Sequence, residues 1–271
     1  KSGNTWIRSL LSAYYYSESG NFSFELLKNI GLYPQKKYFD IKIDKPGEIN
    51  SYWDISQKKI VSKKKTIFLK THNSLLSLGG KNFTKPEYTL GIIYVVRDPR
   101  NVITSLKNHY DLNYEQSLNF MLNEKKYIYD IREKNDYSDF QFLSSWSNHY
   151  KSWKNCKDFK VLFIRYEDIE YEKYKTFKKI LLFINNVSKK DNKIDEKKLI
   201  NSINSTNFNN LKNKEENEGF EESVISRETG QKKRFFNLGF NNRWEKILPK
   251  DILNKLNHNL QNELNELGYN I

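Results

Sequence analysis

Residues 91–100 read Gly-Ile-Ile-Tyr-Val-Val-Arg-Asp-Pro-Arg, an apolar run that ends in a charged turn. β-Branched and aromatic side chains dominate the run, which predicts a buried strand over residues 91–96. A helical pattern begins at Pro99 and continues to residue 110. The segment therefore predicts a strand, a turn and a helix in direct succession.

Two further short runs, at residues 66–69 and 160–164, also predict strands. Longer helical patterns separate and flank these runs, at residues 5–16, 114–132, 140–154, 174–185 and 249–267. Strands that alternate with helices predict parallel βαβ units with helices on both faces of the sheet. We therefore expect an α/β fold with three layers, in a single domain that spans residues 1–271.

The composition bounds the class of protein. Of the 271 residues, 37% are hydrophobic and 15% aromatic, with 11 glycines and 5 prolines, which suits a buried core and excludes disordered and fibrous proteins. Cys156 is the single cysteine, so an internal disulfide and a thiolate metal site are excluded, and a reducing, cytoplasmic compartment is expected. No apolar run approaches the roughly 18 residues of a membrane span.

The charge of the chain is strongly positive. Its 46 basic and 33 acidic residues leave a net charge of +13, which favours anionic partners such as phosphate, sulfate, nucleic acid or a membrane surface. Lysine and asparagine also dominate the polar positions throughout, which favours a biased background composition. Both interpretations stay open.

The ends of the predicted strands carry basic or hydrogen-bonding side chains. Parallel sheets bind ligands at the carboxyl ends of their strands, so these positions predict the site. His72 follows the first strand and could act as a general base or be a structural residue. Arg97 follows the second strand, and Ser105 lies on the next helix; a guanidinium fork and a hydroxyl in this arrangement suit a phosphate.

The first six residues read Lys-Ser-Gly-Asn-Thr-Trp and run directly into a helical pattern. A loop at a helix amino terminus presents backbone amides to a phosphate group. The segment is not a Walker loop, because its lysine precedes the Ser-Gly pair and no metal-binding hydroxyl follows that lysine. Taken alone, it fits either a phosphate loop or a simple helix start.

Taken together and in this order, residues 1–6, 69–73 and 94–108 resemble the PAPS-dependent sulfotransferase family, in its soluble bacterial branch; PAPS is 3′-phosphoadenosine 5′-phosphosulfate. The resemblance continues through residues 145–149, 165–168, 206–208, 218–221, 235–239 and 267–269. It implies a three-layer fold like that of P-loop NTPases, with PAPS as sulfuryl donor. A strand is expected ahead of Lys1, upstream of this sequence.

The resemblance also assigns roles to residues of the first loop and the adenine site. Lys1 would contact the phosphosulfate, together with amides or hydroxyls of Ser2, Gly3, Asn4 and Thr5. The adenine would lie between Trp6 and Phe208, with Tyr166 and Thr206 hydrogen-bonded to its edges.

Arg97 and Ser105 would hold the 3′-phosphate. The family pattern has an arginine where this chain has Asn237, whereas Gly239 matches the pattern. Arg234 or Arg243 lies close enough in sequence to replace that arginine, and both alternatives stay open.

The chemistry implied by the resemblance is in-line transfer of a sulfuryl group, with His72 as general base and with Lys1 and Lys70 neutralising the developing charge. No metal is required. The acceptor is expected to be a hydroxyl or amine of a small molecule or glycan, with no nucleic acid as partner. Aromatic residues at 14–16, with Phe39, Trp53 and Tyr110, would line its pocket or pack in the core.

Two other functions stay open at this point. A P-loop-like kinase or nucleotide hydrolase would suit the fold, but the sequence has no evident seat for magnesium. A polyanion or nucleic-acid binder with aromatic stacking platforms would suit the charge. The charge-rich segment 209–222 is expected to be exposed, either as a mobile flap over the site or as an ordinary solvated loop.

Overall fold

The structure is a computed structural model that describes residues 2–62, 66–130, 135–226 and 229–270. Its central element is a parallel pair of strands, β5 (Ile92–Val96) and β8 (Val161–Arg165), aligned from Ile92 opposite Val161 to Val96 opposite Arg165. A second parallel pair joins β1 (Gly31–Leu32) to β2 (Leu69–Lys70). The α/β class and the parallel pairing are confirmed.

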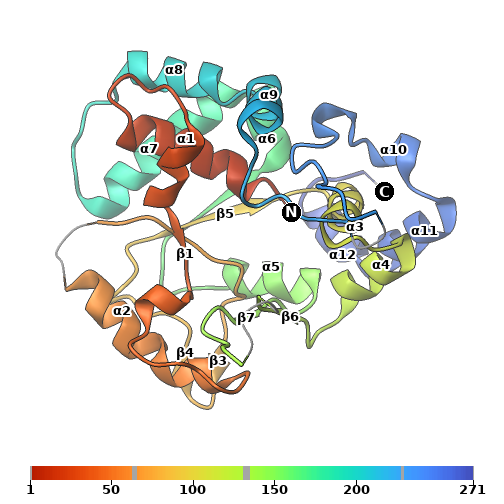
Figure 1. The fold of residues 1–271 in the computed structure, drawn as a ribbon, viewed down its shortest axis with the longest axis horizontal. Coiled ribbons are helices and arrows are strands. Elements are labelled where there is room, and N and C mark those ends of the chain that lie inside the picture. Colours follow the sequence, from red (N-terminus) through yellow and green to blue (C-terminus); the bar gives the residue numbers. More distant parts are fainter. Residues whose placement is uncertain (1, 63–65, 131–134, 227–228, 271) are drawn as a thin grey trace.

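The two faces of the β5–β8 pair pack on different helices, as the alternation of side chains along a strand requires. One face, with Ile93 and Ile164, packs in the core formed by α1 (Asn4–Tyr16) and α7 (Lys173–Ser188). The opposite face, with Tyr94 and Phe163, packs towards α5 (Trp146–Lys154) through Tyr150. Figure 1 shows β5 between α1 and α7 above and α5 below.

Three of the predicted helices are confirmed with nearly the predicted ends: α1, α7 and α3 (Pro99–Tyr110). The start of α3 has a local cause. Asp98 accepts a hydrogen bond from the amide of Arg100 at 2.9 Å, and Pro99 fills the first helical turn, where an amide is not needed. The helix is thereby anchored directly at the end of β5.

The remaining elements are shorter and surround these. The helices are α2 (Trp53–Val61), α4 (Tyr114–Leu122), α6 (Tyr166–Tyr171), α8 (Glu196–Ser205), α9 (Phe208–Glu218), α10 (Trp244–Ile247), α11 (Lys250–Asn259) and α12 (Gln261–Glu266). The strands β3 (Ser77–Leu78) and β4 (Lys81–Asn82) form one antiparallel pair, and β6 (Tyr127–Ile128) and β7 (Gln141–Phe142) form another. Short 3₁₀ turns lie at Phe24–Asn29, Lys36–Tyr38, Glu48–Tyr52 and Gly239–Asn241.

Several predicted boundaries are wrong. The helix predicted over 114–132 ends at Leu122, because the chain then turns into β6; the end of that prediction lies outside the described residues. The helix predicted from residue 140 starts at Trp146, since 141–142 form β7 and Ser145 caps the helix by accepting from Asn148. The helix predicted over 249–267 breaks at Leu260 into α11 and α12.

The segment 209–222 is not an exposed loop. Most of it forms α9, whose Leu211 and Glu215 are buried, and Phe220 beyond the helix is also buried. The charged residues that suggested full exposure lie on one face only of this helix, while a leucine and a paired glutamate occupy the other. Whether the segment moves stays a prediction.

Within the described residues, the helices are all too short or too polar to cross a membrane.

Candidate functional site

The carboxyl ends of β2, β5 and β8 open onto a continuous cavity of about 1930 Å³. Most of the residues singled out in the sequence line it, namely Ser2, Gly3, Asn4, Thr5, Trp6, Lys70, His72, Arg97, Ser105, Tyr166, Phe208, Arg234, Asn237 and Gly239. Thr206 and Arg243 do not line the cavity. Lys1 lies outside the described residues.

The loop before α1 takes its shape from Gly3. This residue has a φ of 98°, in the left-handed region that favours glycine, and a Cβ there would lie 2.6 Å from Cδ2 of Tyr166. The Tyr166 ring therefore packs directly on the loop. The first amides of α1 have no intrahelical acceptor, so the loop can offer them to an anion.

Trp6 is fixed by Thr206, which itself does not line the cavity. The indole Nε1 of Trp6 donates to the carbonyl oxygen of Thr206 at 2.9 Å. Thr206 is fully buried, and its hydroxyl donates to the carbonyl oxygen of Ser202 at 2.6 Å. The structure thus gives Thr206 a supporting contact with Trp6 and does not bring its side chain to the cavity.

The ring of Phe208 packs directly against Gly239, and both residues line the cavity. A Cβ at Gly239 would lie 2.5 Å from the Phe208 ring, and Gly239 has a φ of 52°. A larger residue at position 239 would therefore displace the ring. Phe208 begins α9, which Asn207 caps by accepting from the amide of Asn210 at 2.9 Å.

Arg97 is a buried cation at the end of β5. Its guanidinium carbon lies 3.9 Å from the centre of the Tyr166 ring, and its Nε finds no hydrogen-bond partner among the residues described. A buried donor without a partner is costly and suits a bound anion. Ser105 lies on α3, and its hydroxyl accepts from Nδ2 of Asn242 at 3.2 Å.

Asn242 is a residue that the sequence did not single out. It is buried, lines the cavity, and also donates to the carbonyl oxygen of Asn101 at 2.9 Å. Its role depends on contacts between segments 141 residues apart, for which the local sequence gives no signal.

Two arginines could replace the arginine that the family pattern has at position 237. These residues, Arg234 and Arg243, are both exposed, and Arg234 forms an ion pair with Glu216 at 3.0 Å.

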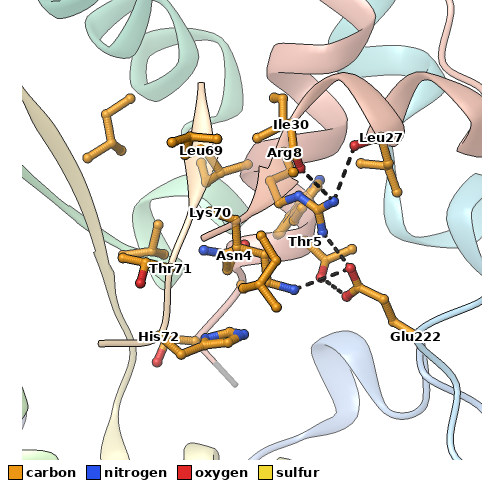
Figure 2. Close-up of a pocket in the computed structure, with 18 of the residues that line it drawn as sticks. Asn4, Thr5, Arg8, Leu27, Ile30, Leu69, Lys70, Thr71, His72 and Glu222 are labelled. Carbon is orange, nitrogen blue, oxygen red and sulfur yellow. Dashed lines mark hydrogen bonds and ion pairs between the residues drawn. The ribbon is translucent and has the colours of Figure 1, made fainter. Parts of the chain in front are cut away.

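Glu222 connects three basic or hydroxyl groups beside the loop (Figure 2). Its Oε1 lies 2.5 Å from Nη1 of Arg8 and 3.2 Å from Nζ of Lys70, and its Oε2 accepts from the Thr5 hydroxyl at 3.1 Å. Burial opposes the charge of Glu222, but Lys70 and Arg8 outweigh burial and hold its pKa at about 2. Burial also lowers the pKa of Lys70, and Glu222 opposes that effect. Arg8 and Glu222 both lie outside the sequence motifs.

The backbone of His72 is hydrogen-bonded on both sides. Its N–H donates to Oε1 of Gln141 at 2.7 Å, and its carbonyl oxygen lies 3.2 Å from Nε2 of His149. Because a carbonyl only accepts, Nε2 of His149 carries a hydrogen, and Nδ1 accepts from the Tyr94 hydroxyl at 2.9 Å. Burial lowers the pKa of His149 to about 4, so this ring is neutral at physiological pH.

Throughout the described ranges, no three or more histidine, cysteine, aspartate or glutamate side chains gather closely enough to hold a metal ion. The arrangement instead offers cations, hydroxyls and backbone amides around one cavity, with an imidazole at its edge. Such a set can bind an anionic nucleotide and remove a proton from a second substrate.

Comparisons with known proteins identify the family and the fold. A family model described as "Sulfotransferase domain" matches residues 1–268. A solved structure of retinol dehydratase in complex with androsterone and inactive cofactor PAP is 16% identical, with a TM-score of 0.59 over 97% of this chain and 78% of that one. Mouse sulfotransferase SULT7A1 complexed with PAP is 19% identical, with a TM-score of 0.52 over 96% and 81%. No curated protein sequence matches significantly.

Proposed function

This chain belongs to the sulfotransferase domain family, and on that premise we propose that it transfers the sulfuryl group of PAPS to a hydroxyl or amine of a small-molecule or glycan acceptor. One observation carries the proposal. The phosphate-type loop, the buried Arg97 and the imidazole of His72 line the same cavity at the carboxyl ends of the strands. The same cavity could therefore bind the anionic donor and remove the proton of the acceptor.

The donor would lie along the cavity from the loop to α3. Ser2, Gly3, Asn4 and Thr5 would bind its 5′ end, as would Lys1. Trp6, Tyr166 and Phe208 would enclose the adenine, and Arg97 and Ser105 would bind the 3′-phosphate. The unpartnered Nε of Arg97 supports this last assignment, because a phosphate oxygen would satisfy it.

The reaction is a displacement at sulfur. The acceptor oxygen or nitrogen forms a bond to sulfur, the bond from sulfur to the 5′-phosphate oxygen breaks, and that electron pair leaves with adenosine 3′,5′-bisphosphate (PAP). His72 accepts the proton of the acceptor, a contribution of typically about 10² to 10⁴ in rate. Lys70 and Lys1 stabilise the charge that develops on the leaving oxygens, so no metal is needed.

The proposal extends to the layers of the fold and to the cellular location of the protein. Helices pack on both faces of the β5–β8 pair, which supports the three-layer, P-loop-like arrangement. The single cysteine supports a cytoplasmic location.

The test is a donor-dependent transfer assay in EDTA. The protein is incubated with PAPS and a panel of phenols, alcohols, amines and oligosaccharides, and release of PAP is followed. We expect PAP to form at a rate that depends on one acceptor class and is unaffected by EDTA. A protein that instead consumes ATP only when magnesium is supplied would refute the proposal in favour of a kinase or hydrolase.

A further inference from the structure

The Glu222 carboxylate holds groups that the proposed function assigns to the donor. Thr5, in the first turn of α1, would bind the 5′-phosphate, and Lys70 would stabilise the leaving oxygens, yet both hydrogen-bond to Glu222. Figure 2 shows Glu222 on the opposite side of these side chains from the main chain of β2. A carboxylate carries the charge and the acceptor oxygens that a phosphate or sulfate would bring.

The electrostatics of the cluster explain why an internal anion is needed. Arg8 and Lys70 are each only 10% exposed at the side chain, so two cations share a poorly solvated space. Arg8 is further fixed by donating to the carbonyl oxygens of Leu27 and Ile30 at 3.3 Å and 3.0 Å. Without Glu222, neither charge would have a counter-ion in this cluster, a costly state inside a protein.

The Glu222 carboxylate also weakens the binding of other anions at Thr5 and Lys70. An incoming anion must take Thr5 and Lys70 from Glu222, and until it does so it meets the negative charge of that group. A small anion that binds through these contacts alone gains little from the exchange. PAPS has a second anchor, because Arg97 and Ser105, which also line the cavity, would hold its 3′-phosphate.

Glu222 can withdraw without a large movement of the chain. It lies between two fixed points, the buried Phe220 and the Ser223 hydroxyl, which donates to Oε1 of Glu215 at 2.6 Å. The Glu222 side chain is itself 29% exposed, so a change of rotamer can carry its carboxylate towards solvent.

We infer that Glu222 is a donor-specificity residue. Its carboxylate occupies the phosphosulfate cradle, which is the part of the cavity beside Thr5 and Lys70. It yields this place to a nucleotide that is anchored at its 3′-phosphate, and it excludes free phosphate and sulfate. This inference rests on the proposed function. Its signature is the sign of the effect: removing the charge of Glu222 strengthens the binding of ligands that reach the cradle and leaves other ligands unaffected.

The test compares Glu222→Gln with wild type by calorimetric titration of two ligands. PAP reaches the cradle with its 5′-phosphate, whereas adenosine 3′-monophosphate lacks that group. We expect E222Q to bind PAP about tenfold more tightly than wild type does, because PAP no longer competes with a charged group for two hydrogen bonds. The two proteins should bind adenosine 3′-monophosphate with the same affinity. Inorganic phosphate should compete with PAP in E222Q at concentrations that leave wild type unaffected.

Glu221→Gln is the matched control, because it removes the same charge at the neighbouring, exposed position and should change neither affinity. Glu222→Ala removes the carboxylate altogether and should also gain PAP affinity, which provides the same test of sign if E222Q is poorly folded. PAP binding by E222Q that is unchanged or weaker would overturn the inference and make Glu222 a positioning residue for Lys70. If wild type fails to prefer PAP over adenosine 3′-monophosphate and also fails to bind PAPS, the proposed function falls with it.

Discussion

The backbone of His72 is held in place by two neighbouring side chains. Its N–H is bound by Gln141 and its carbonyl by His149, and neither contact involves the imidazole. We therefore expect His72→Ala to lower turnover by about 10² to 10⁴, the usual contribution of a general base, with PAP affinity nearly unchanged. PAP release from PAPS, with the acceptor found in the transfer assay, measures the first quantity and calorimetry the second. A variant with the wild-type rate would remove His72 from the mechanism.

His149 makes the fold sensitive to acid. Burial lowers its folded-state pKa to about 4, below the ordinary value of 6.5, so the unfolded chain binds a proton more readily between these values. The contribution of His149 is complete above about pH 6.5 and is lost as the pH falls to about 4, a change of about 3 kcal/mol in the free energy of unfolding.

Denaturant unfolding of wild type and His149→Gln across this pH range measures the effect. The glutamine amide can donate to the His72 carbonyl and accept from Tyr94 without titrating, so its stability should fall less steeply with acid. Parallel curves for the two proteins would contradict the assignment. His149→Phe leaves both partners unsatisfied and should cost about 1–3 kcal/mol at pH 7.

At the scale of elements, Glu215 joins α9 to the segment 235–239, which lines the cavity. Its carboxylate accepts from the amides of Phe235 and Phe236 at 2.7 Å and 2.8 Å. Glu215→Gln replaces one acceptor oxygen with a donor facing an N–H group, so we expect a loss of about 1–3 kcal/mol in stability and weaker PAP binding. Thermal unfolding and calorimetry measure these, and hydrogen exchange at residues 235–236 should accelerate.

The control for this prediction is the neighbouring Glu216→Gln. Glu216 forms an ion pair with Arg234 whose side chains are 39% and 57% exposed, so its loss should cost less than about 1 kcal/mol. If E216Q weakens PAP binding as strongly as E215Q, Arg234 contributes to the nucleotide site, and the role given to Glu215 is wrong.

The sequence predicted elements well where a strong local signal sets both ends. The apolar run before Arg97 and the Asp98-Pro99 start predicted β5 and α3 to within a residue. Residues 141–142 and 31–32 form two-residue strands, which are too short for a period of two to be recognised. The helix in 209–222 was missed because its buried stripe is sparse, with Leu211 and Glu215 four residues apart among charged side chains.

At the scale of the whole molecule, the cavity is assembled from segments that are distant in the sequence. Gly3 packs against Tyr166, Trp6 is held by Thr206, and Phe208 packs against Gly239. The sequence identified most of these residues through their motifs, but it could not show that Thr206 supports Trp6 or that Asn242 reaches Ser105. Contacts over such separations depend on the tertiary fold, and so does the Glu222 cluster, whose members lie in three separate segments.

The measurement that tests the central claim most directly is calorimetric titration of the intact protein with PAP in EDTA, with adenosine 5′-monophosphate as the control ligand. The account predicts a dissociation constant in the micromolar range or tighter for PAP and a large loss of affinity when the 3′-phosphate is absent, because Arg97 and Ser105 would then have no anion to bind. Equal binding of the two nucleotides, or no binding of either, would contradict the donor site on which the proposed function rests.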